Sequence, residues 1–311
     1  MSEPKGREPE GRGPELAWEV AVPARAELAE HPVWDAARAC LIWVDINAGQ
    51  VHRFRPEAGK GDAGDEILAD VGVAVGAAIP RRAGGYVLAA ADGFRLTAAD
   101  GSPAAGPLRP PGMPGDVRFN DGACDQAGRF WAGTVALDMR AGAGSLYRLD
   151  PDGSVALVFG GVTESNGLGW SPHGETFYYI DSGEPEPRVR AFAHDPATGE
   201  LSGERDLVRF GPADGIPDGL AIDAAGCLWI AMWQGGCVRR YTAAGELLGI
   251  FPVPVTQPTC PGFAGRDLDQ LYLTSAWQGM DAAQLAAEPL AGHVLRARPG
   301  VTGLPTGNYG G

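Results

Sequence analysis

The sequence predicts an all-β fold, a six-bladed β-propeller, from its composition, its short β-rich segments and a motif that recurs six times. The chain of 311 residues contains 47 Gly and 26 Pro. So many turn formers suit short strands better than long helices. Segments such as LIWVDI, RFWAGTV and CLWIAMW are rich in β-branched and aromatic residues, and they are too short to establish the period of a helix.

The recurring motif is an apolar strand, a turn with Asp or Gly, an aromatic strand, another turn and a strand with a basic residue. Its copies begin at six positions: Pro32, Ala77, Gly122, Leu168, Leu220 and Pro261. The intervals of 45, 45, 46, 52 and 41 residues match the length of propeller blades. A β-sandwich does not repeat its internal order six times, and a helical solenoid needs apolar residues at helical spacing.

The repeats predict a single propeller domain over residues 17–311, after a disordered tail over residues 1–16. The stretch LAWEVAVPARAEL before the first repeat is a spare strand. We expect it to pair near the C-terminus and close the ring, because an open propeller would expose a strand edge. The sixth repeat carries an insertion around Asp281 to Leu290, and its sequence DAAQLAAEPL predicts a helix.

The composition also indicates the environment and partners of the chain. Its formal net charge is −14 and its sequence pI about 4.8, so neither nucleic acid nor anionic membrane is an expected partner. The N-terminus lacks the apolar stretch of a signal peptide, and no long apolar window follows, which predicts a cytoplasmic protein. We expect a monomer or a weak homo-oligomer. The five cysteines lack C-x-x-C spacing. We expect buried reduced thiols, with a Cys227–Cys237 pairing as the alternative.

Four repeats place an oxygen-bearing side chain at the same point, just upstream of the strand that lines the central channel. These residues are Glu30, Asn120, Asn166 and Asp218. The second repeat offers Gly76 at this point and the sixth offers Thr259 or Pro258. Residues in the same phase of each blade lie at the same height around the axis. The pattern therefore predicts a ring of four oxygen ligands at one mouth of the channel.

Two carboxylates and two amides form an all-oxygen site that suits a hard divalent cation. Ca²⁺ is the preferred ion, and Zn²⁺, Mn²⁺ and Mg²⁺ are alternatives. A simpler interpretation is that Asn-Gly and Asp-Gly are turn pairs, although it leaves Glu30 unexplained.

The chain resembles the family of senescence marker protein (regucalcin), gluconolactonase and luciferin-regenerating enzyme. The stretches that carry the resemblance are AEHPVWD, RFNDGACDQAGRFWAGTVALD, SNGLGWSPHGETFYYIDS and IPDGLAIDAAGCLWIAMWQGGCVRRY. They extend over nearly the whole chain after about Ala17. The resemblance implies a six-bladed propeller with a divalent ion near its axis and, in many members, hydrolysis of sugar lactones. Aldonolactones such as glucono-, xylono- or arabinonolactone are the substrates it suggests.

Carried over residue by residue, the resemblance implies that Glu30, Asn120, Asn166 and Asp218 are the metal ligands. It also implies that Arg118, Asn120 and Asp138 contact the substrate and that Asp218 is the catalytic base. The chain departs from the family where His31 follows Glu30, since members often have a small residue there. Asp138 stands where members often have the longer Glu.

Several alternatives stay open at this stage. Bound to a cation, Asp218 would be a weak base, so Asp121 is a second candidate. Trp233 is expected either in the pocket wall or in the core. The same site could serve a metal-dependent esterase or organophosphatase, or a calcium-binding regulatory protein without turnover.

Overall fold

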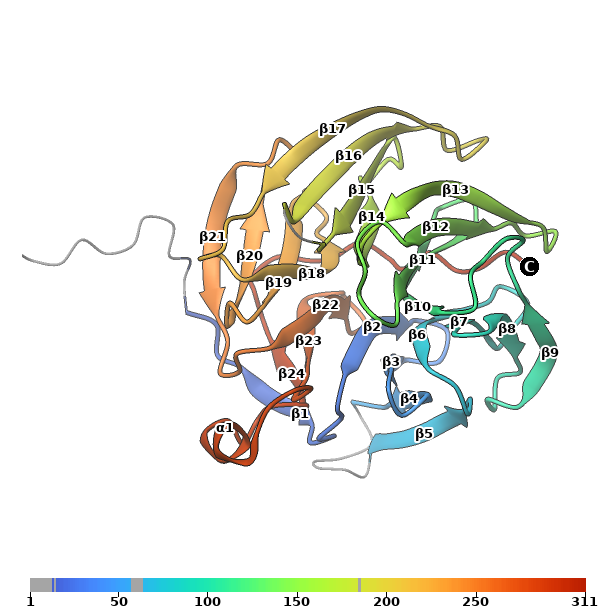
Figure 1. Cartoon of the computed structure of the whole chain (residues 1–311). Coiled ribbons are helices and arrows are strands. Elements are labelled where there is room, and N and C mark those ends of the chain that lie inside the picture. Colours follow the sequence, from blue (N-terminus) through green and yellow to red (C-terminus); the bar gives the residue numbers. More distant parts are fainter. Residues whose placement is uncertain (1–12, 14, 57–63, 184–185) are drawn as a thin grey trace, which may run out of the picture.

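The structure is a computed structural model that describes residues 13, 15–56, 64–183 and 186–311. In this part of the chain, 24 strands form six four-stranded antiparallel sheets. The sheets are arranged as blades around a central axis (Figure 1). The predicted six-bladed β-propeller is therefore confirmed, and each predicted repeat start falls within the innermost strand of a blade.

Five blades are built from four consecutive strands, numbered from the axis outwards. The first blade contains β2 (Ala29–Asp35), β3 (Cys40–Asp45), β4 (Gln50–Phe54) and β5 (Asp65–Asp70). The second contains β6 (Val75–Pro80), β7 (Tyr86–Ala90), β8 (Gly93–Thr97) and β9 (Pro103–Leu108). The third contains β10 (Val117–Cys124), β11 (Phe130–Ala136), β12 (Gly144–Leu149) and β13 (Val155–Val162). The fourth contains β14 (Ser165–Trp170), β15 (Thr176–Asp181), β16 (Arg188–His194) and β17 (Leu201–Arg209). The fifth contains β18 (Ile216–Ile222), β19 (Leu228–Trp233), β20 (Cys237–Tyr241) and β21 (Leu247–Pro252).

The sixth blade joins the two ends of the chain. It contains β22 (Pro258–Ala264), β23 (Gln270–Ser275), β24 (Val294–Ala297) and β1 (Glu19–Val22). Strand β1 pairs antiparallel with β24, with Glu19 opposite Arg296, which confirms the predicted ring closure. Between β23 and β24 lies the short helix α1 (Ala282–Ala287), whose N-cap Asp281 forms a capping box with Gln284. The predicted helical insertion is thus also confirmed.

The tail predicted over residues 1–16 lies mostly outside the described residues. Within the described part, the backbone N–H of Gly13 donates to the carbonyl of Ile250 at 3.0 Å, and Leu16 is buried against the fifth and sixth blades. The chain therefore contacts the propeller before residue 17. Among the described residues, no helix has the length and hydropathy that a membrane crossing requires.

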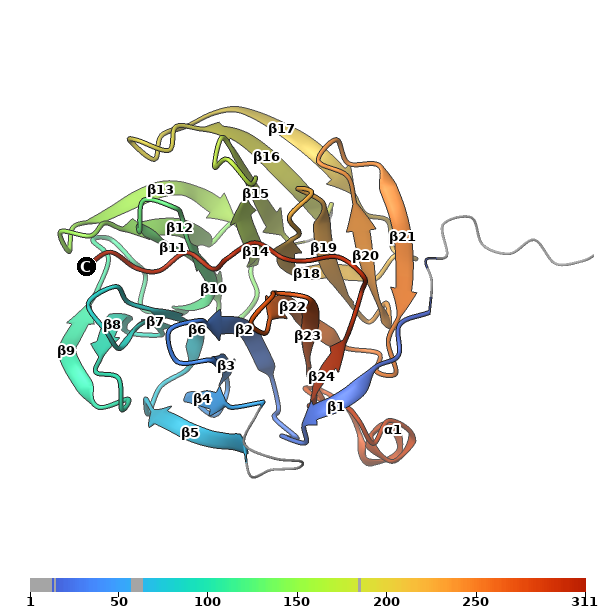
Figure 2. The ribbon, with the colours of Figure 1, turned by 180° about the vertical axis from the view of Figure 1, so that it is seen from behind.

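The last residues of the chain cross the end of the propeller. The N–H of Leu304 donates to Ile222 in the fifth blade, and the N–H of Tyr309 donates to Pro80 in the second. Figure 2 shows this tail running over the inner strands towards the third blade. All five cysteines are free, so the Cys227–Cys237 pairing is not formed.

Tryptophans pack between neighbouring blades. The side chains of Trp34, Trp43, Trp131, Trp170 and Trp229 are all buried. Two of these indoles form the same kind of hydrogen bond in different blades. Trp131 Nε1 donates to Asp125, and Trp229 Nε1 donates to Asp223, six residues earlier in each case. The networks therefore fix the turn between the first two strands of the third and fifth blades.

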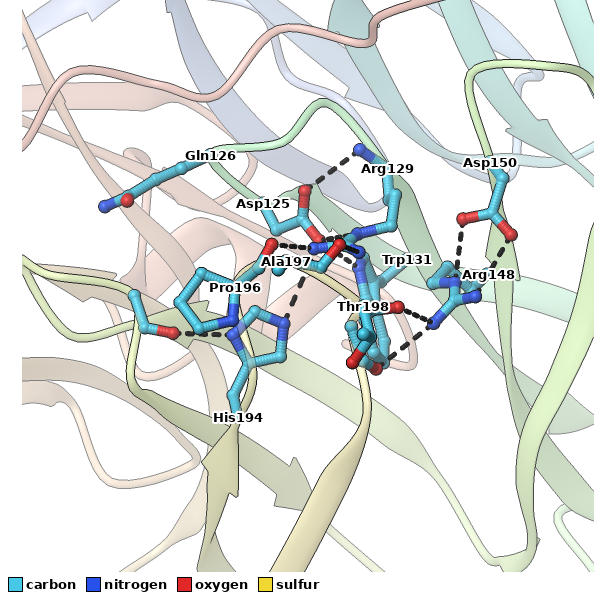
Figure 3. Close-up of polar contacts among 12 residues, drawn as sticks. Asp125, Gln126, Arg129, Trp131, Arg148, Asp150, His194, Pro196, Ala197 and Thr198 are labelled. Atoms are coloured by element: carbon cyan, nitrogen blue, oxygen red, sulfur yellow. Dashed lines mark hydrogen bonds and ion pairs between the residues drawn. The ribbon is translucent and has the colours of Figure 1, made fainter.

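The Asp125 network also links two blades (Figure 3). Asp125 Oδ2 accepts from Arg129 Nε at 2.6 Å, and Arg129 in turn donates to the carbonyls of Pro196 and Ala197 in the fourth blade. His194 stands beside this pair, and burial lowers the pKa of its imidazole. The buried charge of Arg129 thus depends on Asp125 for its neutralisation.

We predict that Asp125→Ala lowers the free energy of unfolding by about 3–5 kcal/mol, because it leaves the buried guanidinium of Arg129 without its carboxylate. Chemical denaturation measures the change. The control is Glu204→Ala, which removes an exposed ion pair with Arg190 and should cost less than about 1 kcal/mol. Equal effects of the two substitutions would contradict a structural role for the buried pair.

Candidate functional site

A β-bulge interrupts the innermost strand of every blade at the same point. The pairing register shifts within Glu30–Val33, Val75–Ala77, Phe119–Asp121, Ser165–Leu168, Pro217–Leu220 and Pro258–Pro261. A bulge bends its strand and changes the direction of the side chains beside it. The six bulges explain why residues of the same phase converge near the axis at one end of the channel.

The structure brings five of the sequence-predicted site residues together. A cavity of about 220 Å³ at this end of the channel is lined by Glu30, Arg118, Asn120, Asn166 and Asp218. The four predicted ligands are 5–7% exposed. Trp233 also lines this cavity, with Leu28, Ile46, Met139, Glu164, Ile216 and Gln278. Trp233 therefore belongs to the pocket wall.

Hydrogen bonds hold the two amides in a defined orientation. Asn120 Nδ2 donates to Asn166 Oδ1 at 2.7 Å and to the carbonyl of Ser165 at 2.8 Å. Asn166 Nδ2 donates to Ser182 Oγ at 2.8 Å, and Arg118 Nη1 donates to Asn120 Oδ1 at 2.6 Å. Each amide oxygen thus accepts one bond, and its second lone pair stays available for a ligand.

The two carboxylates are poorly compensated. Burial raises the pKa of Glu30, and the charge of Asp121 adds to this effect. Burial likewise raises the pKa of Asp218, with Glu30 as the next cause. Glu30 Oε2 accepts from the N–H of His31 at 2.7 Å, whereas no donor in the described part of the chain bonds to the carboxylate of Asp218.

This donor set fits a divalent cation. Two buried carboxylates that repel one another need a positive charge between them, and the amide oxygens add neutral hard ligands. Within the described residues, no group of three or more His, Cys, Asp or Glu side chains is placed to hold a metal. A metal centre on the axis therefore depends on the two asparagines as well as the two acids.

The glycines after the ligands allow the inner strands to approach closely. Gly167 and Gly219 lie in β14 and β18, so the turn-pair interpretation is wrong at these positions. A Cβ at Gly167 would lie 2.5 Å from Leu220, and one at Gly219 would lie 2.4 Å from Cys260. Side chains here would force neighbouring blades apart and widen the ring of ligands.

A second tier of residues lies two positions before the four ligands. Because side chains two residues apart share a face of a strand, the residues at these positions also line the cavity: Leu28, Arg118, Glu164 and Ile216. Glu164 was missed by the sequence analysis. Glu164 lies two residues before Asn166, as Arg118 lies two residues before Asn120, and this equal spacing in the sequence would have predicted its position. Burial raises the pKa of Glu164, and the charge of Arg118 opposes the effect.

Asp138 does not line this cavity. It follows β11, its side chain is 63% exposed, and its Oδ1 accepts from Arg140 Nη1 at 2.9 Å. Its neighbour Met139 does line the cavity. The structure therefore does not bring Asp138 together with Arg118 and Asn120, and its contact with a substrate stays a prediction.

Asp121 lies on the other side of the ligand ring. Its Oδ1 bonds to His31 Nδ1 at 3.0 Å and accepts from the N–H of Gly122 at 2.7 Å. Asp121 and His31 line a second cavity of about 520 Å³, which the C-terminal residues Leu304–Asn308 also line. Since Asp121 does not line the cavity that holds Arg118 and Glu164, the geometry favours Asp218 over Asp121 as a base there.

The fold and this site define a class: six-bladed propellers with an oxygen-lined polar cavity at one end of the central channel. Residues 28–277 match the family described as SMP-30/Gluconolactonase/LRE-like region, and the chain belongs to this family.

It is 38% identical over 298 residues to regucalcin of Danio rerio, covering 94% of this chain and 98% of the relative. It is 37% identical over 291 residues to pentonolactonase XacC of Haloferax volcanii, covering 91% and 95%. A solved structure, the calcium-binding protein regucalcin of Agrobacterium tumefaciens, superposes with a TM-score of 0.86 at 26% identity, covering 95% of this chain and 98% of the other.

We predict that a divalent cation stabilises the wild-type protein at concentrations at which it stabilises Asp218→Asn much less, because the variant needs more metal to be saturated. At about 100 times its Kd, one bound ion adds about 2.7 kcal/mol, which appears as a higher Tm in thermal denaturation. Ca²⁺, Mg²⁺, Mn²⁺ and Zn²⁺ are added separately to chelated protein. Glu175→Gln, which alters an exposed carboxylate, is the control and should respond as the wild type does.

The raised pKa values add a second expectation for the metal-free protein. A carboxyl whose pKa is higher in the folded state stabilises the fold at low pH, and this contribution is lost as the pH rises through the folded-state value. Metal-free Asp218→Asn should therefore be more stable than metal-free wild type at neutral pH. This difference in the free energy of unfolding should become smaller at acid pH, where the carboxyl of the wild type is protonated. The opposite order would contradict a poorly compensated pair.

Proposed function

We propose that this protein is a metal-dependent hydrolase that opens a sugar lactone, an aldonolactone such as glucono-, xylono- or arabinonolactone. The observation that carries the proposal is one cavity that holds two buried carboxylates, two oriented amides and an arginine with unused donors. The name of the Haloferax volcanii relative, a pentonolactonase, supports the same class of substrate.

Glu30, Asn120, Asn166 and Asp218 would hold the cation. When bound, a divalent ion supplies Lewis acidity for a carbonyl and lowers the pKa of water. The oxygen-only donor set favours Ca²⁺, and the description of the Agrobacterium neighbour as calcium-binding agrees with this choice.

Arg118 positions the lactone. Its Nη1 donates to the carbonyl of Phe119 and to Asn120 Oδ1, which fixes the guanidinium beside the ligand ring. No acceptor in the described part of the chain bonds to its Nε or Nη2. These donors are available for a carbonyl, ring or hydroxyl oxygen of the substrate, and the planar guanidinium can make two contacts at once.

Asp218 acts as the general base in this proposal. As the water oxygen bonds to the carbonyl carbon, a carboxylate oxygen of Asp218 takes its proton. The bond from that carbon to the ring oxygen then breaks, and the proton passes to the ring oxygen. The product is the open hydroxy acid, so atoms and charges balance. The buried cavity limits competing water around the reacting carbonyl.

We predict that the protein hydrolyses one or more aldonolactones and that chelation removes the activity. A panel of glucono-, xylono- and arabinonolactone is assayed with a pH indicator, before chelation, after it and after each metal is restored. Turnover of phenyl acetate or a phosphotriester but of no lactone would replace the proposal with an esterase or organophosphatase. Calcium binding without any turnover would indicate a regulatory protein.

We also predict that Asp218→Asn lowers kcat by about 10²–10⁴-fold, the range typical for loss of a general base. The assay uses metal at a concentration that saturates each variant, so that loss of the ion and loss of the base are separated. Glu175→Gln should retain wild-type kcat. Near-normal kcat in metal-saturated Asp218→Asn would show that another group takes the proton.

A further inference from the structure

Arg118 and Glu164 lie in the same tier of the cavity and carry opposite charges. Arg118 belongs to β10, and Glu164 immediately precedes β14 in the next blade. Both residues line the cavity, yet they do not form an ion pair within the described part of the chain. Opposite charges that line one cavity without touching leave room for a ligand that contacts both.

The backbone of Glu164 is fixed on both sides. Its N–H donates to Asp181 Oδ1 at 3.1 Å, and its carbonyl accepts from the N–H of Ser182 at 3.0 Å. It also forms a β-bridge with Val135. Its carboxylate, in contrast, has no hydrogen-bond donor among the described residues. Glu164 is only partly buried, so its free carboxylate is accessible from the cavity, and a ligand that supplies a donor can bond to it.

We propose that Glu164 accepts a hydrogen bond from a hydroxyl of the lactone and thereby selects hydroxylated lactones over unsubstituted ones. This inference rests on the proposed function, which it makes more specific. An ionised carboxylate is an acceptor only. It can therefore accept a hydrogen bond from a hydroxyl of a sugar lactone, whereas a methylene group in the same place offers it no donor.

The rest of the tier suits the same substrate. Leu28 and Ile216 occupy the matching positions in the first and fifth blades and line the same cavity. Their apolar side chains can pack against the carbon face of a small ring, while Arg118 and Glu164 contact its oxygens. Asp138, which the family resemblance assigns to the substrate hydroxyls, is instead paired with Arg140 outside the cavity. Glu164 is thus the carboxylate that the structure offers for this contact.

The test compares two lactones with the same ring, D-xylono-1,4-lactone and γ-butyrolactone, which lacks hydroxyls. Glu164→Leu should lose about 10- to 100-fold in kcat/KM on the hydroxylated lactone, the effect of one charge-assisted hydrogen bond, mostly through KM. The loss on γ-butyrolactone should be less than about 2-fold. Glu164→Gln, which retains one acceptor oxygen, should lie between Glu164→Leu and the wild type. Glu175→Gln is the matched control on an exposed carboxylate.

Two outcomes would overturn the inference. An equal loss of kcat/KM on both lactones would mean that Glu164 supports the shape of the cavity or the binding of the metal. In that case, a smaller metal-induced rise in Tm for Glu164→Gln would show that the effect is on metal binding. A hydroxyl-selective loss in Asp138→Asn, with none in Glu164→Leu, would return the contact to Asp138.

A binding measurement keeps the inference separate from the proposed reaction. The probes are 1,5-anhydro-D-glucitol, a ring polyol that cannot be hydrolysed, and tetrahydropyran, its hydroxyl-free ring. Ligand-observed NMR with metal-loaded protein should show binding of the polyol that Glu164→Leu weakens about 10-fold or more. If the wild type hydrolyses no lactone, the proposed function fails, and this binding difference still decides the role of Glu164. Unchanged polyol binding in Glu164→Leu would overturn the inference.

Discussion

The close packing of six bulged inner strands around one axis is the constraint on which the candidate site depends. Ring closure by β1 and β24 sets the circumference, because the sixth blade needs a strand from each end of the chain. The glycines of β14 and β18 then let adjacent inner strands approach until a Cβ would clash with the next blade. Only at that separation do four side chains from four blades share one small cavity.

The same packing works against stability at the axis. Bringing Glu30 and Asp218 out of water raises the pKa of both; the charge of Asp121 raises that of Glu30 further, and the charge of Glu30 raises that of Asp218. The rest of the propeller has ample apolar packing to tolerate this local cost, with large aromatic residues buried between the blades. Uncompensated charge in a rigid, preorganised ring is the arrangement that a cation stabilises, so the cost of the metal-free site and the affinity proposed for an ion have one origin.

Much of this could be predicted from the sequence because the blades repeat. The period of the repeat predicts the number of blades, and the shared position within the repeat groups Glu30, Asn120, Asn166 and Asp218. The bulges could not be predicted, since a one-residue register shift leaves no mark in the composition, and so Asn-Gly and Asp-Gly could equally be interpreted as turns. The surroundings of Asp138 depend on a loop and on its ion pair with Arg140. The position of a residue within the repeat does not determine either of these. The two-residue periodicity of strands, in contrast, is enough to place Glu164 on the same side of the chain as Asn166.

That periodicity has a consequence for how such a site can change. The ligand ring and the tier two residues before it lie on the same inner segments of four blades. Arg118 and Ile216 belong to β10 and β18, and Leu28 and Glu164 immediately precede β2 and β14, so the same blade packing positions both sets. Yet a substitution in the second tier alters neither the oxygens of the ring nor the close approach of the strands. In this chain the second tier combines one cation, one anion and two apolar side chains, which is a pattern of contacts for a ligand rather than a set of metal ligands. A substitution at a position such as Glu164 can therefore change the contacts offered to a ligand while it leaves the axial ring, which sterics and charge constrain, unaltered.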